Sequence, residues 1–443
     1  MRGSNCWNRW ASFGPTVAAL FPLVLVGCGS DNDPASPTIP EPTPAAAPPP
    51  GAEPTKDDPV AFTQAFVQRA VDLFDAEGLD ATLAVYNDPA SVDGAWYVFI
   101  VDSDHVIIAH PTVPENIGDS LLGPAGVDSA GNIMGPTLAA ASADGVWVDY
   151  NYLNPETGEE GVKHTWAIRH EGLLFASGWY EGGPTDASVE AQTQGVVRQA
   201  VQRVRESGLE TAINFYNTPA STSGPWYVAF LDERAVVLTH ADSALLGKSS
   251  LGALGVDVIG RVFGPEFLRL PPEGGWVDYA SLNPAVGEQG RKHSWAQLEE
   301  EHWIVSGWYE PGLVAADPAA RAVGVVEGAI QYADTYGEEA AVAFYNTEAS
   351  TLGSWYAFLI DAQGDLVAIA PAPDKIGLNA YVPEDATDSA GHFYGPKLAQ
   401  ATEEGVWVTY RQANPGADGE DQVKHTFARR HGNLIFCAGW YEG

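Results

Sequence analysis

The strongest constraint on the fold is an internal repeat with a period of about 130 residues, seen three times along the 443-residue chain. The same short motifs recur in the same order in each copy. They are Tyr86-Asn87, Trp96-Tyr97 and Trp147-Val148-Asp149-Tyr150 in the first copy, Tyr216-Asn217, Trp226-Tyr227 and Trp276-Val277-Asp278-Tyr279 in the second, and Tyr345-Asn346, Trp355-Tyr356 and Trp407-Val408-Thr409-Tyr410 in the third. A period of this length is that of a whole domain, since solenoid units are about 20–45 residues long. We therefore expect tandem domains at 59–183, 187–312 and 318–443.

Within each copy, the spacing of apolar residues predicts one long helix followed by strands. Between positions 62 and 74 they recur every three or four residues, as on one face of a helix. Glycines are expected to end the three helices: Gly78, Gly208 and Gly337. Runs rich in β-branched and aromatic residues follow, for example at 96–101 and 162–168. The sequence predicts an α+β fold, in which each domain is a long N-terminal helix plus a five- to six-stranded antiparallel sheet.

The first residues have the features of an export signal. Arg2 and Arg9 precede an apolar stretch at 17–26, which is shorter than the roughly 20 apolar residues that span a bilayer. This stretch ends in Gly27-Cys28, which resembles the bacterial lipobox. The resemblance implies a signal peptide at 1–27, removal of that peptide and lipidation of Cys28; the alternative is an ordinary signal peptide with an incidental cysteine. Gly29 implies placement in the outer membrane if the organism is Gram-negative.

Composition limits the kinds of partner. The Pro-rich segment at 28–58 shows no apolar periodicity and is interpreted as a disordered tether. The net charge of −36 should repel nucleic acid, and we interpret this acidity as a device for solubility. Of the cysteines Cys6, Cys28 and Cys437, only Cys437 falls in a predicted domain, so no disulfide framework is expected and Cys437 is interpreted as a buried structural thiol.

The order of motifs in each copy resembles the single Cache domain of type two. In the first copy these motifs are the leading helix, the Trp96-Tyr97 strand, His110-Pro111, Ile117-Gly118, Asp128-x-x-Gly131, Gly145-x-Trp147, Asn154-Pro155, Lys163 and Gly178-x-Tyr180. The resemblance covers nearly all of each copy. It implies a PAS-like sheet and an extracytoplasmic sensor that binds small organic molecules, often short carboxylates, in a pocket on one face. In the family a membrane helix and a signalling domain usually follow; here we expect any signal to leave through another protein.

The resemblance also directs the choice of ligand-binding residues. A buried carboxylate needs a paired charge or hydrogen bonds, and each copy offers a Lys-His pair on a predicted strand whose alternation puts the two side chains on opposite faces. The candidate ligand-binding residues are Lys163, His110, Trp147 and Tyr97 in the first copy, Lys292, His240, Trp276 and Tyr227 in the second, and Lys424, Trp407 and Tyr356 in the third. The alternatives are solvated lysines and core aromatics. Because Ala370 replaces the histidine in the third copy, that domain would bind differently, or not at all, if the histidine contacts ligand.

Other chemistries find little support in the sequence. Asp128-x-x-Gly131 and its counterparts offer one or two carboxylates where calcium takes six to eight oxygens, so we interpret them as Asx turns. The sequence contains no zinc-protease motif, paired-cysteine motif or phosphate-binding loop, and we expect neither a metal nor a cofactor. Ser177 lies near Lys-His, but Ala438 replaces it in the third copy and no nucleophile elbow surrounds it, so we do not expect an enzyme.

These observations lead to one functional hypothesis and one rival. We expect a lipid-anchored, extracytoplasmic sensory protein of the cell envelope that binds a small organic solute, a short carboxylate being one candidate. Occupancy would be passed to a partner receptor or transporter. The rival is a structural or adhesion lipoprotein of the envelope, in which the pockets have degenerated and the Trp-rich surfaces contact other macromolecules.

Overall fold

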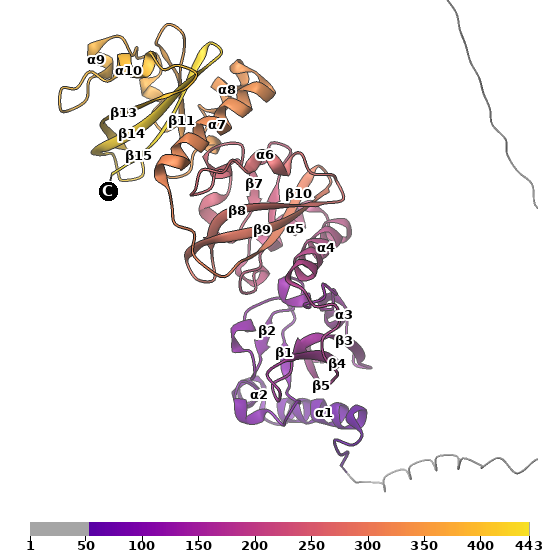
Figure 1. Cartoon of the computed structure of the whole chain (residues 1–443). Helices are drawn as coiled ribbons and strands as arrows, with labels where there is room; N and C mark the ends of the chain where they lie inside the picture. Colours follow the sequence, from indigo (N-terminus) through magenta and orange to yellow (C-terminus); the bar gives the residue numbers. More distant parts are fainter. Residues whose placement is uncertain (1–52, 443) are drawn as a thin grey trace, which may run out of the picture. The chain divides into compact units, whose positions relative to one another are not determined.

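The computed structural model describes residues 53–442, which contain three similar units of helix and sheet (Figure 1). We call them repeat 1, which runs from α1 to β5, repeat 2, from α4 to β10, and repeat 3, from α7 to β15. Each contains one five-stranded antiparallel sheet, so the predicted α+β fold is confirmed and the strand number is five. The signal peptide expected at 1–27, Cys28 and the tether up to residue 52 lie outside the described residues.

A helix of 19 residues opens each repeat: α1 Pro59–Glu77, α4 Val189–Ser207 and α7 Pro318–Tyr336. The side chains of Asp58, Ser188 and Asp317 cap these helices by accepting a hydrogen bond from a backbone N–H in the first turn. Each helix ends at a glycine with positive φ, as predicted, and a shorter helix follows. The shorter helices are α2 Leu79–Tyr86, α5 Leu209–Tyr216 and α8 Glu338–Phe344.

The sheet of repeat 1 has the strand order β2-β1-β5-β4-β3. Its strands are β1 Phe99–Val101, β2 Ile107–Ala109, β3 Val146–Leu153, β4 Glu160–His170 and β5 Leu173–Glu181. Repeat 2 has the same order with β6 Ala229–Leu231, β7 Val237–Thr239, β8 Gly275–Asn283, β9 Glu288–Glu299 and β10 His302–Tyr309. Repeat 3 has it again with β11 Ala357–Ile360, β12 Leu366–Ile369, β13 Val406–Asn414, β14 Glu420–His431 and β15 Leu434–Tyr441. The predicted internal repetition therefore extends to sheet topology.

Between the second and third strand of each sheet, the chain makes a long connection that contains short helical turns. In repeat 1 these are η2 Pro114–Asn116, η3 Pro124–Gly126 and α3 Gly135–Ala139; in repeat 2, η5 Ser243–Leu245, η6 Ala253–Gly255 and α6 Gly264–Phe267; in repeat 3, η8 Pro373–Lys375, α9 Pro383–Ala386 and α10 Gly395–Ala399. A further turn precedes each first strand, at η1 Pro89–Ser91, η4 Pro219–Ser221 and η7 Glu348–Ser350. We call the connection between the second and third strand the cover, because it packs on one face of the sheet.

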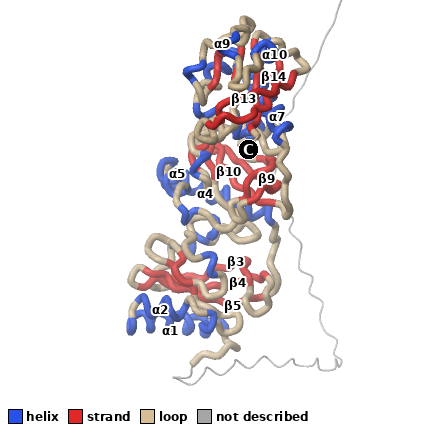
Figure 2. Tube along the Cα trace, turned by 90° about the vertical axis from the view of Figure 1, so that its left-hand side faces the viewer, coloured by secondary structure: helices blue, strands red, loops and turns tan. Residues whose placement is uncertain are grey.

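Two hydrophobic clusters lie on opposite faces of each sheet. In repeat 1, Val98 and Ile100 pack with α1, whereas Tyr97 and Phe99 pack with the cover, as strand alternation requires. Figure 1 shows α1 and α2 along one side of strands β3, β4 and β5 and α3 on the other, and Figure 2 shows the same helical layer beside this sheet. The face under the cover is the one that holds the site described below.

The covers of repeats 1 and 2 also contact the first helix of the following repeat. Val127 of repeat 1 packs into the cluster of α4, and Val256 of repeat 2 packs into the cluster of α7. Backbone hydrogen bonds also join these covers to the short turns η4 and η7 of the following repeat. The Ser120 N–H donates to the Ala220 carbonyl oxygen and the Ser249 N–H to the Ala349 carbonyl oxygen, both at 2.8 Å. These contacts lie within one compact unit, Glu53–Gly443.

Candidate ligand-binding cavity

In each repeat a buried lysine lies beneath the cover, on the fourth strand along the chain, which is β4, β9 or β14. Lys163, Lys292 and Lys424 are each at most 2% exposed. Burial lowers the pKa of Lys292 and of Lys424 to about 7, and that of Lys163 well below its ordinary value. A solvated strand lysine, the alternative to ligand contact, is therefore excluded by the structure at all three positions.

Tyrosines surround these lysines. The Nζ of Lys424 donates to the Tyr356 hydroxyl at 2.7 Å, and that of Lys292 donates to the Tyr227 hydroxyl. Lys163 instead makes no hydrogen bond through Nζ to any residue within 53–442, and this atom lies 3.8 Å from the ring centroid of Tyr97. Burial raises the pKa of all three tyrosines well above 10, so these hydroxyls stay protonated and can both donate and accept.

The two histidines expected in the site lie in equivalent places and are both neutral. The pKa of His110 and of His240 is lowered to about 3, mainly by burial and to a smaller extent by the charge of the neighbouring lysine. In repeat 1 the His110 Nε2 lies 3.1 Å from the Tyr152 hydroxyl. Repeat 2 has Ser281 at the Tyr152 position, and within the described chain no hydrogen bond from His240 Nε2 replaces that contact.

The cavity between sheet and cover differs in size among the repeats. Its volume is about 270 Å³ in repeat 2, about 100 Å³ in repeat 3 and about 20 Å³ in repeat 1. One water needs roughly 10–15 Å³ by this measure, so repeat 1 has room for about one water and repeat 2 for a small organic molecule.

Two substitutions on the sheet account for the open cavity of repeat 2. Ala229 stands where repeats 1 and 3 have Phe99 and Phe358, and Ser281 stands where repeat 1 has Tyr152. In repeat 1 the two larger rings fill the space themselves and line what remains of the cavity. The same backbone therefore holds a filled site in one repeat and an open one in the next.

The structure brings together most, but not all, of the predicted site residues. Tyr227, His240 and Lys292 line the cavity of repeat 2, Tyr356 and Lys424 that of repeat 3, and Tyr97 and His110 the small cavity of repeat 1. Lys163 is buried beside its cavity but is not part of the lining.

The three tryptophans proposed for the site lie on the other face of the sheet. Trp147, Trp276 and Trp407 pack against Trp166, Trp295 and Phe427, at centroid distances of 5.1, 5.4 and 5.1 Å. The reason is strand alternation: Tyr150, three positions after Trp147, faces the cover, so Trp147 faces the helix side. We therefore drop the tryptophans from the site and replace them with Tyr150, Tyr279 and Tyr410, which line the cavities.

Several polar residues of the repeat 2 cavity were missed from the sequence. Ser250, Gln289 and Arg321 line it, and Ser250 Oγ, Gln289 Oε1 and Arg321 Nε are buried without a hydrogen-bond partner among the described residues. Buried polar atoms are almost always paired in folded proteins, so their concentration at one cavity indicates a place for a polar ligand. A comparison of the copies could have found Ser250, which stands where repeats 1 and 3 have Leu121 and Ala380.

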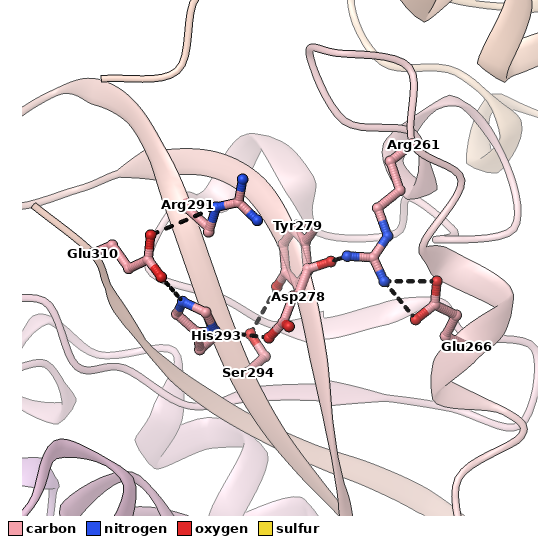
Figure 3. Close-up of polar contacts among 8 residues, drawn as sticks. All are labelled: Arg261, Glu266, Asp278, Tyr279, Arg291, His293, Ser294 and Glu310. Carbon is pink, nitrogen blue, oxygen red and sulfur yellow. Dashed lines mark hydrogen bonds and ion pairs between the residues drawn. The ribbon is translucent and has the colours of Figure 1, made fainter. Parts of the chain in front are cut away.

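The histidine of each Lys-His pair lies on the outer, helix-side face, as alternation predicts. In repeat 2, His293 lies 2.8 Å from Asp278 and 2.9 Å from Glu310, and its ring stacks on Trp308 (Figure 3). The same view shows Arg291 beside Glu310. This polar cluster is separated from the cavity by the sheet itself, so His293 is not part of the cavity.

The Asp-x-x-Gly motifs form turns, as expected. The Asp257 carboxylate accepts hydrogen bonds from the backbone N–H groups of Ile259, Arg261 and Ala280, at 2.8 to 3.1 Å. These bonds fix the cover against β8.

Within residues 53–442 there is no group of three or more His, Cys, Asp or Glu side chains placed to hold a metal ion, and no helix is both long enough and apolar enough to cross a membrane.

Comparisons with known proteins found only solved structures of low similarity to this chain. No family model matches the chain, and no curated protein matches it. Similar solved structures include a methyl-accepting chemotaxis protein from Vibrio parahaemolyticus (20% identity, 28% of this chain and 87% of that one, TM-score 0.25). A Cache chemosensory domain described for carboxylic acid recognition is also similar (16% identity, 28% and 93%, TM-score 0.23). So is the ligand-binding domain of Pseudomonas fluorescens chemoreceptor CtaA in complex with L-serine (14% identity, 56% and 86%, TM-score 0.18). These values are too low to transfer a ligand or an activity, so the functional proposal rests on the site.

Proposed function

We propose that this chain is an extracytoplasmic, lipid-anchored protein that binds a small organic molecule, and that repeat 2 holds its principal site. The observation that carries the proposal is the cavity of about 270 Å³ lined by Lys292, His240 and Tyr227, together with buried polar atoms that lack hydrogen-bond partners among the described residues. A cavity with apolar walls and a few directed polar groups is the usual form of a small-molecule site.

The chemistry of the cavity favours a ligand with an acceptor group at its inner end. Lys292 has a pKa of about 7, so it is readily protonated near neutral pH when an anion arrives, and the Tyr227 hydroxyl lies beside it. A short carboxylate satisfies both donors. His240 is neutral, and its Nε2 can donate or accept according to its tautomer.

The wider assignment follows the sequence. We propose that each repeat is a Cache-like domain with the boundaries 59–183, 187–312 and 318–443, that Cys28 carries the lipid and that 28–58 is the tether. We further propose that the protein acts in the cell envelope, at the outer membrane if the organism is Gram-negative, and passes ligand occupancy to a receptor or transporter. No catalytic step is assigned.

For repeat 1 alone, the structure favours the rival hypothesis, in which the cavity has degenerated and the domain has a structural role. Phe99 and Tyr152 fill its cavity to about 20 Å³, and Tyr152 contacts His110 and accepts a hydrogen bond from Asn116 at 2.9 Å. We propose that repeat 1 is a spacer that holds repeat 2 and binds no ligand.

A thermal-shift screen with small carboxylates, amino acids and amines tests the proposal. A ligand at one hundred times its Kd stabilises its site by roughly 2.7 kcal/mol, which is readily measured. We expect at least one compound to raise the unfolding temperature of the wild-type chain but not that of the double variant Ala229→Phe/Ser281→Tyr, which restores the residues of repeat 1. Tyr152→Phe in repeat 1 is the matched control and should keep the shift. Absence of a shift with every compound, or an equal shift in the double variant, would refute the proposal.

A further inference from the structure

Two lining residues of the repeat 2 cavity come from repeat 3, and one of them is charged. Arg321 lies near the start of α7, and it lines the cavity together with Leu352. The start of α7 is held against repeat 2, since the Asp317 N–H donates to the Val258 carbonyl oxygen at 2.8 Å. Gly260 permits this approach, because a Cβ at that position would collide with the backbone of Ala320.

The Arg321 side chain is partly buried, and its Nε is buried without a hydrogen-bond partner among residues 53–442. The central carbon of its guanidinium lies 4.5 Å from the ring centroid of Trp355. Asp257 is the carboxylate that acts on it, but both oxygens of Asp257 already accept backbone hydrogen bonds. Burial lowers the pKa of Arg321 to about 10, so the group is still charged at neutral pH. A buried cation in this state is unfavourable unless an anion joins it.

The other charges at the cavity do not supply that anion. Asp242, the second carboxylate of the lining, is exposed, and its Oδ1 accepts a hydrogen bond from the Ala244 N–H at 2.9 Å. Lys292, which donates a hydrogen bond to Tyr227, is also a basic group and supplies no negative charge. The lining therefore has unmet donor capacity at Arg321 and at Ser250.

Comparison of the interfaces links this arginine to the open cavity. The residue of α4 that corresponds to Arg321 is Gln192, at the contact between repeats 1 and 2. The cavity beside that contact measures about 20 Å³, against about 270 Å³ in repeat 2. The buried cation therefore accompanies the cavity that can accept a ligand.

We infer that the repeat 2 cavity is a site shared between two repeats, in which Arg321 of repeat 3 binds an anionic group of the ligand. This inference rests on the proposed function and adds to it the residue through which occupancy reaches the next repeat. The bound anion neutralises the guanidinium and ties α7 to the cover of repeat 2. Because Arg321 also stacks on Trp355, which packs against the core cluster of repeat 3, ligand binding stabilises the contact between the repeats.

Titration calorimetry with acetate, butyrate, succinate and glutamate on the full chain tests the inference. We expect at least one of these anions to bind wild type, and its affinity to fall at least tenfold in Arg321→Gln. Arg321→Lys keeps the charge but loses the planar fork, so it should bind with an intermediate affinity. Gln192→Ala, at the corresponding position of α4, is the control and should bind like wild type. Hydrogen exchange should show that the bound anion protects the start of α7.

The outcomes separate this inference from the proposed function. Equal affinity in wild type, Arg321→Gln and Arg321→Lys, or binding without protection of α7, overturns the shared site but leaves small-molecule binding by repeat 2 intact. Binding of none of the four anions to wild type counts against the proposed function and removes the basis of this inference as well. If Arg321→Gln does not fold, as judged by circular dichroism, the comparison of Arg321→Lys with wild type decides, and equal affinity refutes the role of the guanidinium.

Discussion

Replacement of Lys292 by methionine should change how the stability of the chain depends on pH. Lys292 is 2% exposed, and burial lowers its pKa from 10.5 to about 7. Each unit of pKa corresponds to about 1.4 kcal/mol, so keeping this lysine charged in the folded chain, below about pH 7, costs roughly 5 kcal/mol. Methionine has a similar length and no charge, so Lys292→Met removes this cost.

The direction of the effect follows from proton binding. Between the folded pKa of about 7 and the ordinary value of 10.5, the unfolded chain binds more protons at Lys292 than the folded chain does. The free energy of unfolding of wild type therefore rises with pH in this window, by about 1.4 kcal/mol per pH unit for this lysine. Above about pH 10 the buried tyrosines, whose pKa is raised, reverse the trend because the unfolded chain then loses protons more readily.

Urea unfolding followed by far-UV circular dichroism, from about pH 7 to about pH 9.5, measures this effect. The stability advantage of Lys292→Met over wild type should be largest at pH 7 and should shrink by about 3 kcal/mol across the range. Lys424 lies in an equivalent environment and titrates in both proteins, so it cancels in the comparison. Lys397→Met, at an exposed position of α10, is the control and should follow the wild-type curve. Parallel curves for Lys292→Met and wild type would show that Lys292 is not held neutral by burial.

Three further predictions follow from the packing. Gly324→Ala should destabilise the chain, because its Cβ would collide with the backbone carbonyl group of Gly260. Gly328→Ala in the same helix has only ordinary contacts and should stabilise the chain by about 0.5–1 kcal/mol, and thermal unfolding of the two variants checks both expectations. Phe99→Ala should destabilise repeat 1 by about 3–5 kcal/mol, as measured by urea unfolding, and should enlarge its small cavity, as measured by xenon binding in crystals. Unchanged stability would contradict the interpretation that the Phe99 ring fills the cavity of repeat 1. Asp257→Ala removes the acceptor of three backbone hydrogen bonds and should lower the free energy of unfolding by at least about 2 kcal/mol. Hydrogen exchange at those three N–H groups should become faster, and unchanged exchange would refute the role of Asp257 in holding the cover.

Much of the site could be predicted because its parts depend on local rules. Strand alternation separates Lys292 from His293 whatever the rest of the fold does, and the structure places them on opposite faces. The same rule showed that Trp147 and Tyr150 oppose each other, but it could not say which of them faces the helix. That choice depends on which side of the sheet α1 packs against, which is a tertiary fact.

The size of the cavity could not be predicted in the same way. It depends on the fit between a sheet and a cover that are separated in sequence, and on whether each ring is present to fill the gap. Ala229 and Ser281 are unremarkable as single residues, and only their shared position beneath the cover makes them the residues that open repeat 2.

The sequence by itself determined the number of copies, the α+β composition of each, the glycines that end the long helices and the Asp turns, because these features follow from periodicity, backbone conformation and short-range hydrogen bonds. Tertiary structure alone decided which copy has room for a ligand and that Arg321 of the next repeat reaches it. The physical reason is distance along the chain: Ala229 and Arg321 lie 92 positions apart and in different repeats. Only the packing of one repeat against the next brings them to the same cavity.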